Sequence, residues 1–207
     1  MATRKYEQRL RAEGAEETRQ RILAAVDERL RAAPSEPVSV DRVAKQAGVA
    51  RSTVYLVFGS RSGLLGAYTD HVFERAGFER LVENVALPDS RERMVDGLRI
   101  GTEIFAADRD VFRALYSMSS LDPDAVGGAI EGWEERRTAG LAAIAARLDK
   151  AGLLRPGVTA KQAADQLWIY TSFDVFDLLY TGRDMSVEET SGAIIDMAVR
   201  SLLADPS

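Results

Sequence analysis

Four neighbouring residues carry side chains and a spacing that suit contact with a nucleic acid. Arg51, Ser52, Thr53 and Tyr55 lie within five positions of one another, shortly after Gly48. A guanidinium group can donate two hydrogen bonds to a guanine edge, and hydroxyl groups can donate to phosphate oxygens. If these residues begin a helix, its free N–H groups and its dipole also favour an anion there. The cluster therefore predicts a DNA site in which Arg51 reads a base edge.

Two short helices joined by a tight turn would position this cluster. Residues 40–47 and about 51–57 have helical periodicity. Ser39 stands where its side chain can cap the first helix, and it is also a candidate DNA contact. Steeply crossed helices need a small residue on the first helix and a residue tolerant of positive φ in the turn. Ala44 and Gly48 meet these two needs. The apolar residues expected on the inward faces are Val43, Ala47, Val49, Val54 and Val57. This is the pattern of a helix-turn-helix, whose second helix enters the major groove.

The rest of the chain is also predicted to be helical, because strand-like alternation between turn residues is absent. The further helices are expected over 16–33, 62–85, 90–107, 109–118, 123–150, 160–181 and 187–203. Together with the two short ones they make nine helices and no sheet, an all-α fold. Composition changes near residue 66, which predicts a DNA-binding domain at 1–66 and a second domain at 67–207.

The charge distribution is uneven along the chain. The net charge of −5 alone argues against nucleic-acid binding. Residues 1–66, however, contain 12 Lys and Arg against 8 Asp and Glu, whereas residues 67–207 contain 15 against 24. A basic N-terminal part therefore precedes an acidic remainder. In the basic part, Arg4 and Lys5 lie on a charged arm at residues 1–15, and Arg61 precedes a long helix; all three are candidate phosphate contacts.

Several function classes are disfavoured by composition. The sequence contains no Cys, so thiolate chemistry and disulfides are excluded. No apolar run approaches the length of a membrane span, so we expect no membrane partner and a cytoplasmic location. The sole histidine, His71, has no metal-ligand cluster, phosphate loop or nucleophile motif beside it. We therefore expect neither an enzyme nor a metal or cofactor site.

The stretch "VSVDRVAKQAGVARSTVYLVFGSRSGLL" resembles the N-terminal domain of TetR/AcrR-type transcriptional regulators. The residues that carry the resemblance are Ala44, Ala47-Gly48-Val49, Thr53-Val54-Tyr55, Phe58 and Leu64. It implies a three-helix DNA-binding head on a larger helical body that binds a ligand and dimerises. Three departures from the family pattern are Ala50 in place of a capping Ser or Thr, Arg61 in place of Lys, and Leu56-Val57 before Phe58.

The body is expected to bind a small, mostly apolar effector. Aromatic and Met residues are concentrated there, and they either line a cavity or form ordinary core. The candidate ligand-binding residues are Met94, Phe105, Phe112, Tyr116, Trp133, Tyr170, Phe173 and Asp177. Asp174 and Asp177 interrupt an apolar run, and a buried carboxylate needs a partner. That partner could be Arg99, Arg113, another subunit or a cationic ligand, and solvent exposure is the alternative.

A homodimer is expected through the last two predicted helices. The segment 163–180 is apolar around most of its circumference, as a helix buried on more than one side would be. A core position in a monomer also explains this, but the family resemblance implies a four-helix dimer interface. Its candidate residues are Leu167, Thr171, Asp174, Leu178, Ile194 and Met197.

The sequence thus favours a ligand-responsive repressor that binds double-stranded, pseudo-palindromic operator DNA as a homodimer. The alternative is a helical small-molecule-binding or protein-interaction module whose head no longer reads DNA. Ala50 and Leu56-Val57 are the only residues that favour this alternative.

Overall fold

The computed structural model describes residues 2–34, 36–84, 88–121, 124 and 128–204, and eleven helices lie in this part of the chain. They are α1 (Ala2–Ala32), α2 (Val40–Gln46), α3 (Arg51–Phe58), α4 (Arg61–Arg75), α5 (Glu79–Asn84), α6 (Ser90–Ala107), α7 (Arg109–Leu121), α8 (Gly128–Lys150), α9 (Ala160–Tyr170), α10 (Phe173–Tyr180) and α11 (Val187–Leu202). No strand occurs among the described residues, and the predicted all-α class is confirmed.

Internal contacts divide the chain into two compact units. The first consists of Met1–Asp70 and Arg113–Ile130, and the second of His71–Phe112 and Glu131–Ser207. The division falls inside α4, α7 and α8, so each of these helices belongs partly to both units. The sequence instead placed a single boundary near residue 66 and did not anticipate that residues 113–130 group with the first unit.

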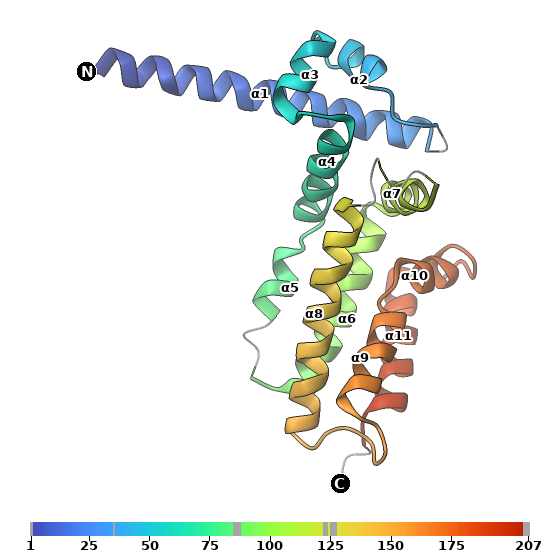
Figure 1. Ribbon diagram of the computed structural model, residues 1–207. Coiled ribbons are helices and arrows are strands. Elements are labelled where there is room, and N and C mark those ends of the chain that lie inside the picture. Colours follow the sequence, from blue (N-terminus) through green and yellow to red (C-terminus); the bar gives the residue numbers. More distant parts are fainter. Residues whose placement is uncertain (1, 35, 85–87, 122–123, 125–127, 205–207) are drawn as a thin grey trace. The chain divides into compact units, whose positions relative to one another are not determined.

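Helices α1, α2 and α3 of the first unit pack around a small apolar core (Figure 1). The side chains that α1 buries recur every three to four residues, which places them on one face of the helix. Gly48 has φ 65° in the turn between α2 and α3, the left-handed conformation predicted for it. The buried residues of this core are Ile22, Leu23, Val26, Leu30, Val38, Val43, Ala44, Val54, Leu64, Leu65 and Tyr68.

The prediction that the first helix begins at residue 16, after a charged arm at residues 1–15, is wrong. Helix α1 begins at Ala2 and continues through Gly14 without a break, and its first half projects beyond α2 and α3 (Figure 1). The segment consists mainly of Glu, Arg, Gln and Ala, which lose little conformational freedom in a helix. The side chains of Arg4 and Lys5 lie outside the described part of the structure, so their DNA contacts stay predictions.

Two of the nine predicted helices are interrupted, which accounts for the total of eleven in the described chain. The helix expected over 62–85 divides into α4 and α5, and Gly77 between them has φ 86°. The helix expected over 160–181 divides into α9 and α10, because the Ser172 hydroxyl caps α10 by accepting a hydrogen bond from the Val175 N–H at 3.3 Å. Hydrophobic periodicity continues across both breaks and does not reveal them.

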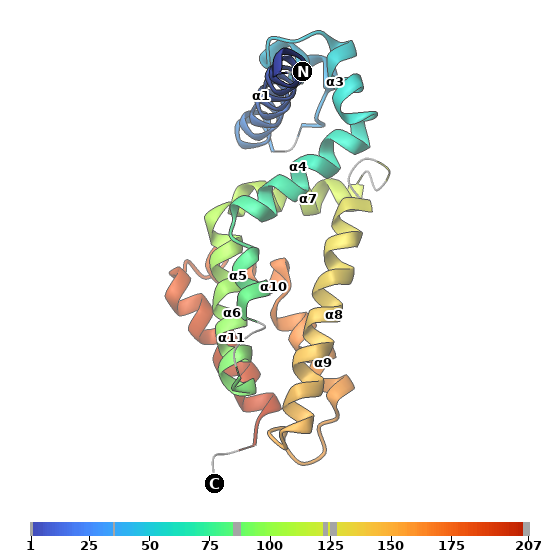
Figure 2. The same cartoon turned by 90° about the vertical axis from the view of Figure 1, so that its left-hand side faces the viewer.

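The second unit has its core between α6, α8, α9 and α11. Helix α11 packs along α6, as Figures 1 and 2 both show. Asp89 caps α6, with its carboxylate 2.7 Å from the Glu92 N–H. Capping boxes at Thr159 and Ser186 fix the beginnings of α9 and α11. The buried residues of this core are Met94, Leu98, Leu141, Ala145, Leu148, Ala163, Leu167, Ile194, Ala198, Leu202 and Leu203.

Among the described residues, no helix combines the length and the apolar character that a membrane span requires.

Candidate nucleic-acid interface and ligand cavity

The start of α3 presents polar side chains to solvent. Arg51 and Ser52 are exposed, Thr53 is half-buried, and Val54 directs the opposite face of the helix into the core. Ala50 is the N-cap residue and no side chain caps α3, as expected from the absence of a Ser or Thr there. An uncapped helix start leaves N–H groups for an external acceptor such as a phosphate.

Arg51 is held over α3 by two neighbours. One guanidinium nitrogen lies 3.1 Å from the Asp41 carboxylate on α2, and another donates to the Tyr55 hydroxyl at 3.3 Å. The guanidinium carbon also lies 5.5 Å from the centre of the Tyr55 ring. The hydrogen bond to Tyr55, reinforced by the charge of Asp41, raises the pKa of Arg51. An exposed arginine is thus oriented by its neighbours at the start of α3.

The other predicted DNA contacts lie around this helix in the first unit. Ser39 is half-buried and precedes α2, but its side chain makes no capping bond. The Arg61 Nε donates to the Val38 carbonyl at 3.0 Å, which ties the start of α4 to the segment before α2. The side chain of Leu56 is 86% exposed beside Tyr55, so an apolar contact surface adjoins the polar one.

Asp41 was not anticipated from the sequence as part of this site. Asp is common in the first turn of a helix, where it interacts with the helix dipole. Because this role already accounts for Asp41, the sequence gives no reason to expect a second role in orienting Arg51. Its pairing with Arg51 spans ten positions across the turn, so only the crossing of α2 and α3 brings the two together.

Comparison with known proteins identifies this arrangement. The sequence model of "Bacterial regulatory proteins, tetR family" matches residues 22–68, which include the core face of α1 and all of α2 and α3. Residues 22–68 therefore match the N-terminal domain of the TetR family. Members of this family are DNA-binding regulators and not enzymes, which agrees with the expectation from the sequence.

Relatives of the chain include TetR-family proteins. The HTH-type transcriptional regulator EthR of Mycobacterium tuberculosis is 34% identical over 95 residues, which cover 45% of this chain and 44% of EthR. The chain thus matches less than half of the length of this relative. NalD of Pseudomonas aeruginosa, the secondary repressor of the MexAB-OprM multidrug efflux pump, superposes with a TM-score of 0.74 at 21% identity, over 92% of this chain and 100% of NalD. A TetR transcription regulator of Haloarcula marismortui gives 0.72 at 18% identity, over 90% and 99%. The two structural likenesses show a shared TetR fold.

The second unit contains a cavity of about 410 Å³, a size typical of small-molecule sites. Of the predicted ligand residues, Met94 and Phe105 line it. Trp133 stacks on Phe73, a lining residue, with ring centroids 4.0 Å apart. The lining residues are Phe73, Phe78, Leu81, Val82, Asn84, Arg93, Met94, Gly97, Leu98, Gly101, Ile104, Phe105, Arg136, Arg137, Gly140, Leu141, Ala143, Ile144, Leu167 and Thr171.

The remaining predicted ligand residues lie elsewhere. Phe112 and Phe173 are fully buried, and each packs edge-on against Phe105. The Tyr170 hydroxyl donates to Ser201 at 3.2 Å. Tyr116 is half-buried and belongs to the first unit.

Asp177 and Asp174 differ in environment. Asp177 is buried and lies 2.5 Å from the Nε of Arg109, which was not among the partners considered for it. This hydrogen bond raises the pKa of Arg109 despite the desolvation of the guanidinium. Asp174 follows the alternative of solvent exposure, because its side chain is exposed one position after the buried Phe173.

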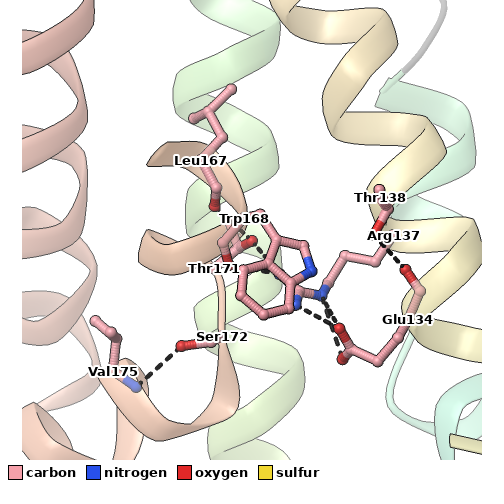
Figure 3. Close-up of polar contacts among 8 residues, drawn as sticks. All are labelled: Glu134, Arg137, Thr138, Leu167, Trp168, Thr171, Ser172 and Val175. Atoms are coloured by element: carbon pink, nitrogen blue, oxygen red, sulfur yellow. Dashed lines mark hydrogen bonds and ion pairs between the residues drawn. The ribbon is translucent and has the colours of Figure 1, made fainter. Parts of the chain in front are cut away.

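Arg137 joins α8 to the end of α9 (Figure 3). One of its terminal nitrogens donates to the Trp168 carbonyl at 2.8 Å and to the Thr171 hydroxyl at 2.7 Å. Its guanidinium also pairs with Glu134 and lies over the Trp168 ring. Thr171, a predicted dimer residue, thus has its polar partners within the chain.

The other predicted dimer residues fall into two groups. Leu167 and Ile194 are buried in the core of their own chain. Asp174, Leu178 and Met197 are exposed, with 67% of Leu178 and 37% of Met197 accessible to solvent.

No group of three or more potential metal ligands occurs among the described residues, and His71 is half-buried on α4.

Proposed function

We propose that this protein is a homodimeric transcriptional repressor that binds a pseudo-palindromic operator through α3 and leaves it when a small molecule fills the cavity of the second unit. The observation that carries the proposal is the exposed start of α3. An oriented arginine and hydroxyl groups surround an uncapped helix end there, within a segment matched by a family of DNA-binding regulators.

Base reading is assigned to Arg51. Its guanidinium retains further donors beyond those used by Asp41 and Tyr55, and a planar fork suits the two acceptors of guanine. Ser52 and Thr53, at the first turn, are assigned to phosphate oxygens, as is Arg61. The exposed Leu56 offers an apolar contact for a thymine methyl group.

Dimerisation is assigned to the outer faces of α10 and α11. Leu178 and Met197 expose apolar surface there although the same helices bury other apolar residues inside the chain. Two heads related by a dyad would reach successive major grooves roughly 34–36 Å apart, or somewhat more, so the operator should be a pseudo-palindrome.

The proposal is tested by selecting bound fragments from a pool of DNA and measuring gel shifts on the enriched sequence. We expect Arg51→Ala to cost about 1–3 kcal/mol of binding and to relax the base preference at one position of each half-site. The matched control is Arg80→Ala, which removes an exposed, ion-paired arginine of the second unit. If the parent enriches no sequence, or Arg51→Ala binds the enriched one like the parent, the assignment fails and the non-DNA-reading alternative takes its place.

A further inference from the structure

Small residues create the cavity of the second unit. Gly97 and Gly101 lie on the face of α6 that lines it, and Gly140 lies on α8 opposite. A β-carbon added at Gly101 or Gly140 would meet no atom within 4 Å. The cavity volume beside these two glycines therefore results from the absence of a side chain at each position and not from a particular side-chain rotamer.

Most of the surface of the cavity is apolar. Phe73 and Phe78 lie edge to face at 6.1 Å, and Met94, Leu98 and Ile104 are almost fully buried along α6. Such a wall favours the hydrocarbon or aromatic part of a ligand, because each methylene group that it removes from water adds to the binding free energy.

Two polar side chains break this apolar lining near the junction of α5 and α6. Asn84 is 8% exposed and Arg93 is 4% exposed, and the Arg93 Nε donates to the Asn84 carbonyl at 3.1 Å. The Asn84 side-chain amide nitrogen has no hydrogen-bond partner among the described residues. No carboxylate in the described part of the chain pairs with Arg93. Burial, with a smaller effect from the like charge of Arg147, lowers the pKa of Arg93.

Both groups offer donors, and the described lining contains no Asp or Glu to accept from them. The two other lining arginines are in different situations. Arg137 pairs with Glu134, and Arg136 lies 4.0 Å over the Trp133 ring. The buried Asn84 amide N–H without an acceptor is costly, and among the described residues the buried Arg93 has an acceptor only at its Nε. An anionic oxygen ligand would supply what both lack.

We propose that the cavity binds a monocarboxylate with an extended apolar body, whose carboxylate pairs with Arg93 and accepts from the Asn84 amide. The apolar body would lie along α6 toward Ile104 and Phe105. Eleven residues separate Arg93 from Ile104, a distance of about 16 Å along the helix, which suits a medium-length chain. The two terminal nitrogens of Arg93 match the two oxygens of a carboxylate. The inference rests on the proposed function only in treating this ligand as the effector, because binding itself requires no DNA.

Calorimetric titration of the full chain with decanoate, decan-1-ol and decyl phosphate, without DNA, tests this inference. All three carry the same ten-carbon chain and differ at the head group. We expect decanoate to bind roughly tenfold or more tightly than decan-1-ol, because a charge-assisted pair adds to the same apolar contacts. Arg93→Met should remove this preference while decan-1-ol binding remains. Arg99→Met, an exposed and ion-paired arginine on the same helix, is the matched control and should keep it.

Two further variants guard against misfolding and non-specific binding. Asn84→Leu keeps the arginine and should reduce the preference for decanoate in part, which gives a second reading if Arg93→Met does not fold. Gly101→Leu fills the cavity and should abolish binding of both decanoate and decan-1-ol. Retention of binding by Gly101→Leu would place the ligand elsewhere and overturn the inference.

The remaining outcomes also decide the matter. Equal affinities for decanoate and decan-1-ol in the parent, no binding of either, or an unchanged preference in Arg93→Met would each overturn it. Tighter binding of decyl phosphate than of decanoate would overturn the choice of a carboxylate. Decanoate binding that depends on Arg93 in a protein that selects no DNA would leave the inference standing and remove the proposed function.

Discussion

Arg51 and Asp41 form an ion pair of 3.1 Å between the two helices of the helix-turn-helix, on the face that we assign to DNA. Both side chains are exposed, so the pair contributes little to stability. Its effect is on geometry: together with the Tyr55 hydroxyl it limits the positions of the guanidinium before DNA arrives. An arginine oriented in advance loses less conformational entropy on binding a base.

Asp41→Asn should therefore separate affinity from base preference. Removing a carboxylate near the phosphates should strengthen binding to all sequences by roughly 0.5–1 kcal/mol at low salt. The preference at the position read by Arg51 should fall, because the guanidinium loses one of its two supports. Quantitative gel shifts on the selected operator and on single-base variants measure both effects. Asp165→Asn, which removes an exposed, ion-paired acid of the second unit, is the control. An unchanged base preference would show that Asp41 does not orient Arg51.

Deleting residues 2–12 should flatten the salt dependence of DNA binding. The deleted segment carries Arg4, Lys5, Arg9 and Arg11, and each phosphate contact contributes about 0.9 to the slope of log affinity against log salt. We expect the slope to fall by about one to two while the dimer persists. Replacing the four basic residues by Ala preserves the helix and should give the same slope. A parent-like slope in both variants would leave the first half of α1 without a role in DNA binding.

Leu178→Glu should dissociate the dimer. Leu178 is the most exposed apolar residue of α10, and a buried, unpaired carboxylate at an interface is strongly unfavourable. Light scattering at micromolar concentration measures the effect. Leu121→Glu changes a leucine that is 87% exposed on α7 and should leave the parent's oligomeric state intact. A monomeric parent protein would refute the assignment outright.

Asp177→Ala should destabilise the second unit by about 1–3 kcal/mol. It removes a buried carboxylate that accepts from Arg109 and, at 2.8 Å, from the Thr181 hydroxyl, and leaves the guanidinium with the exposed Asp110 carboxylate as its acid partner. The expected loss of stability is smaller than for a fully buried ion pair because Arg109 remains partly exposed. Denaturant unfolding of the full chain measures it, and the exposed Asp174→Ala should change stability by no more than about 0.5 kcal/mol. The double variant Arg109→Met/Asp177→Leu should recover part of the loss. No recovery would mean that Asp177 acts mainly through Thr181.

The sequence was most informative where local chemistry decides the structure. The φ of Gly48 and the cap at Asp89 are predictable because both depend on residues within one turn of the chain. The pairing of Arg51 with Asp41 and that of Asp177 with Arg109 were missed because they depend on how helices pack together, and the Arg109–Asp177 bond joins residues 68 positions apart.

The polar end of the cavity is the clearest case of this limit. Asn84 follows Glu83 and Arg93 follows the polar run Asp89 to Glu92, so neither looks like a buried residue in the sequence. Their burial follows from the packing of α5 against α6. An apolar effector was the natural prediction from the aromatic and Met content alone, and the inferred carboxylate adds a charge that content could not reveal.

The last prediction concerns coupling between the cavity and the operator. Helix α4 belongs to both units: Arg61 at its start binds the Val38 carbonyl in the first unit, and Phe73 near its end lines the cavity. A ligand can weaken DNA binding only if it binds more tightly to the conformation that does not fit the operator. A hundredfold weakening requires a coupling free energy of about 2.7 kcal/mol, within the usual range.

Because coupling is reciprocal, operator DNA should weaken decanoate binding by the same factor. Titrating decanoate into the protein with and without operator measures this factor directly, and an unrelated duplex of equal length controls for non-specific charge effects. In Gly101→Leu, operator affinity should not respond to decanoate at all. Equal decanoate affinities with and without operator would show that a cavity ligand, however tightly it binds, does not regulate this protein.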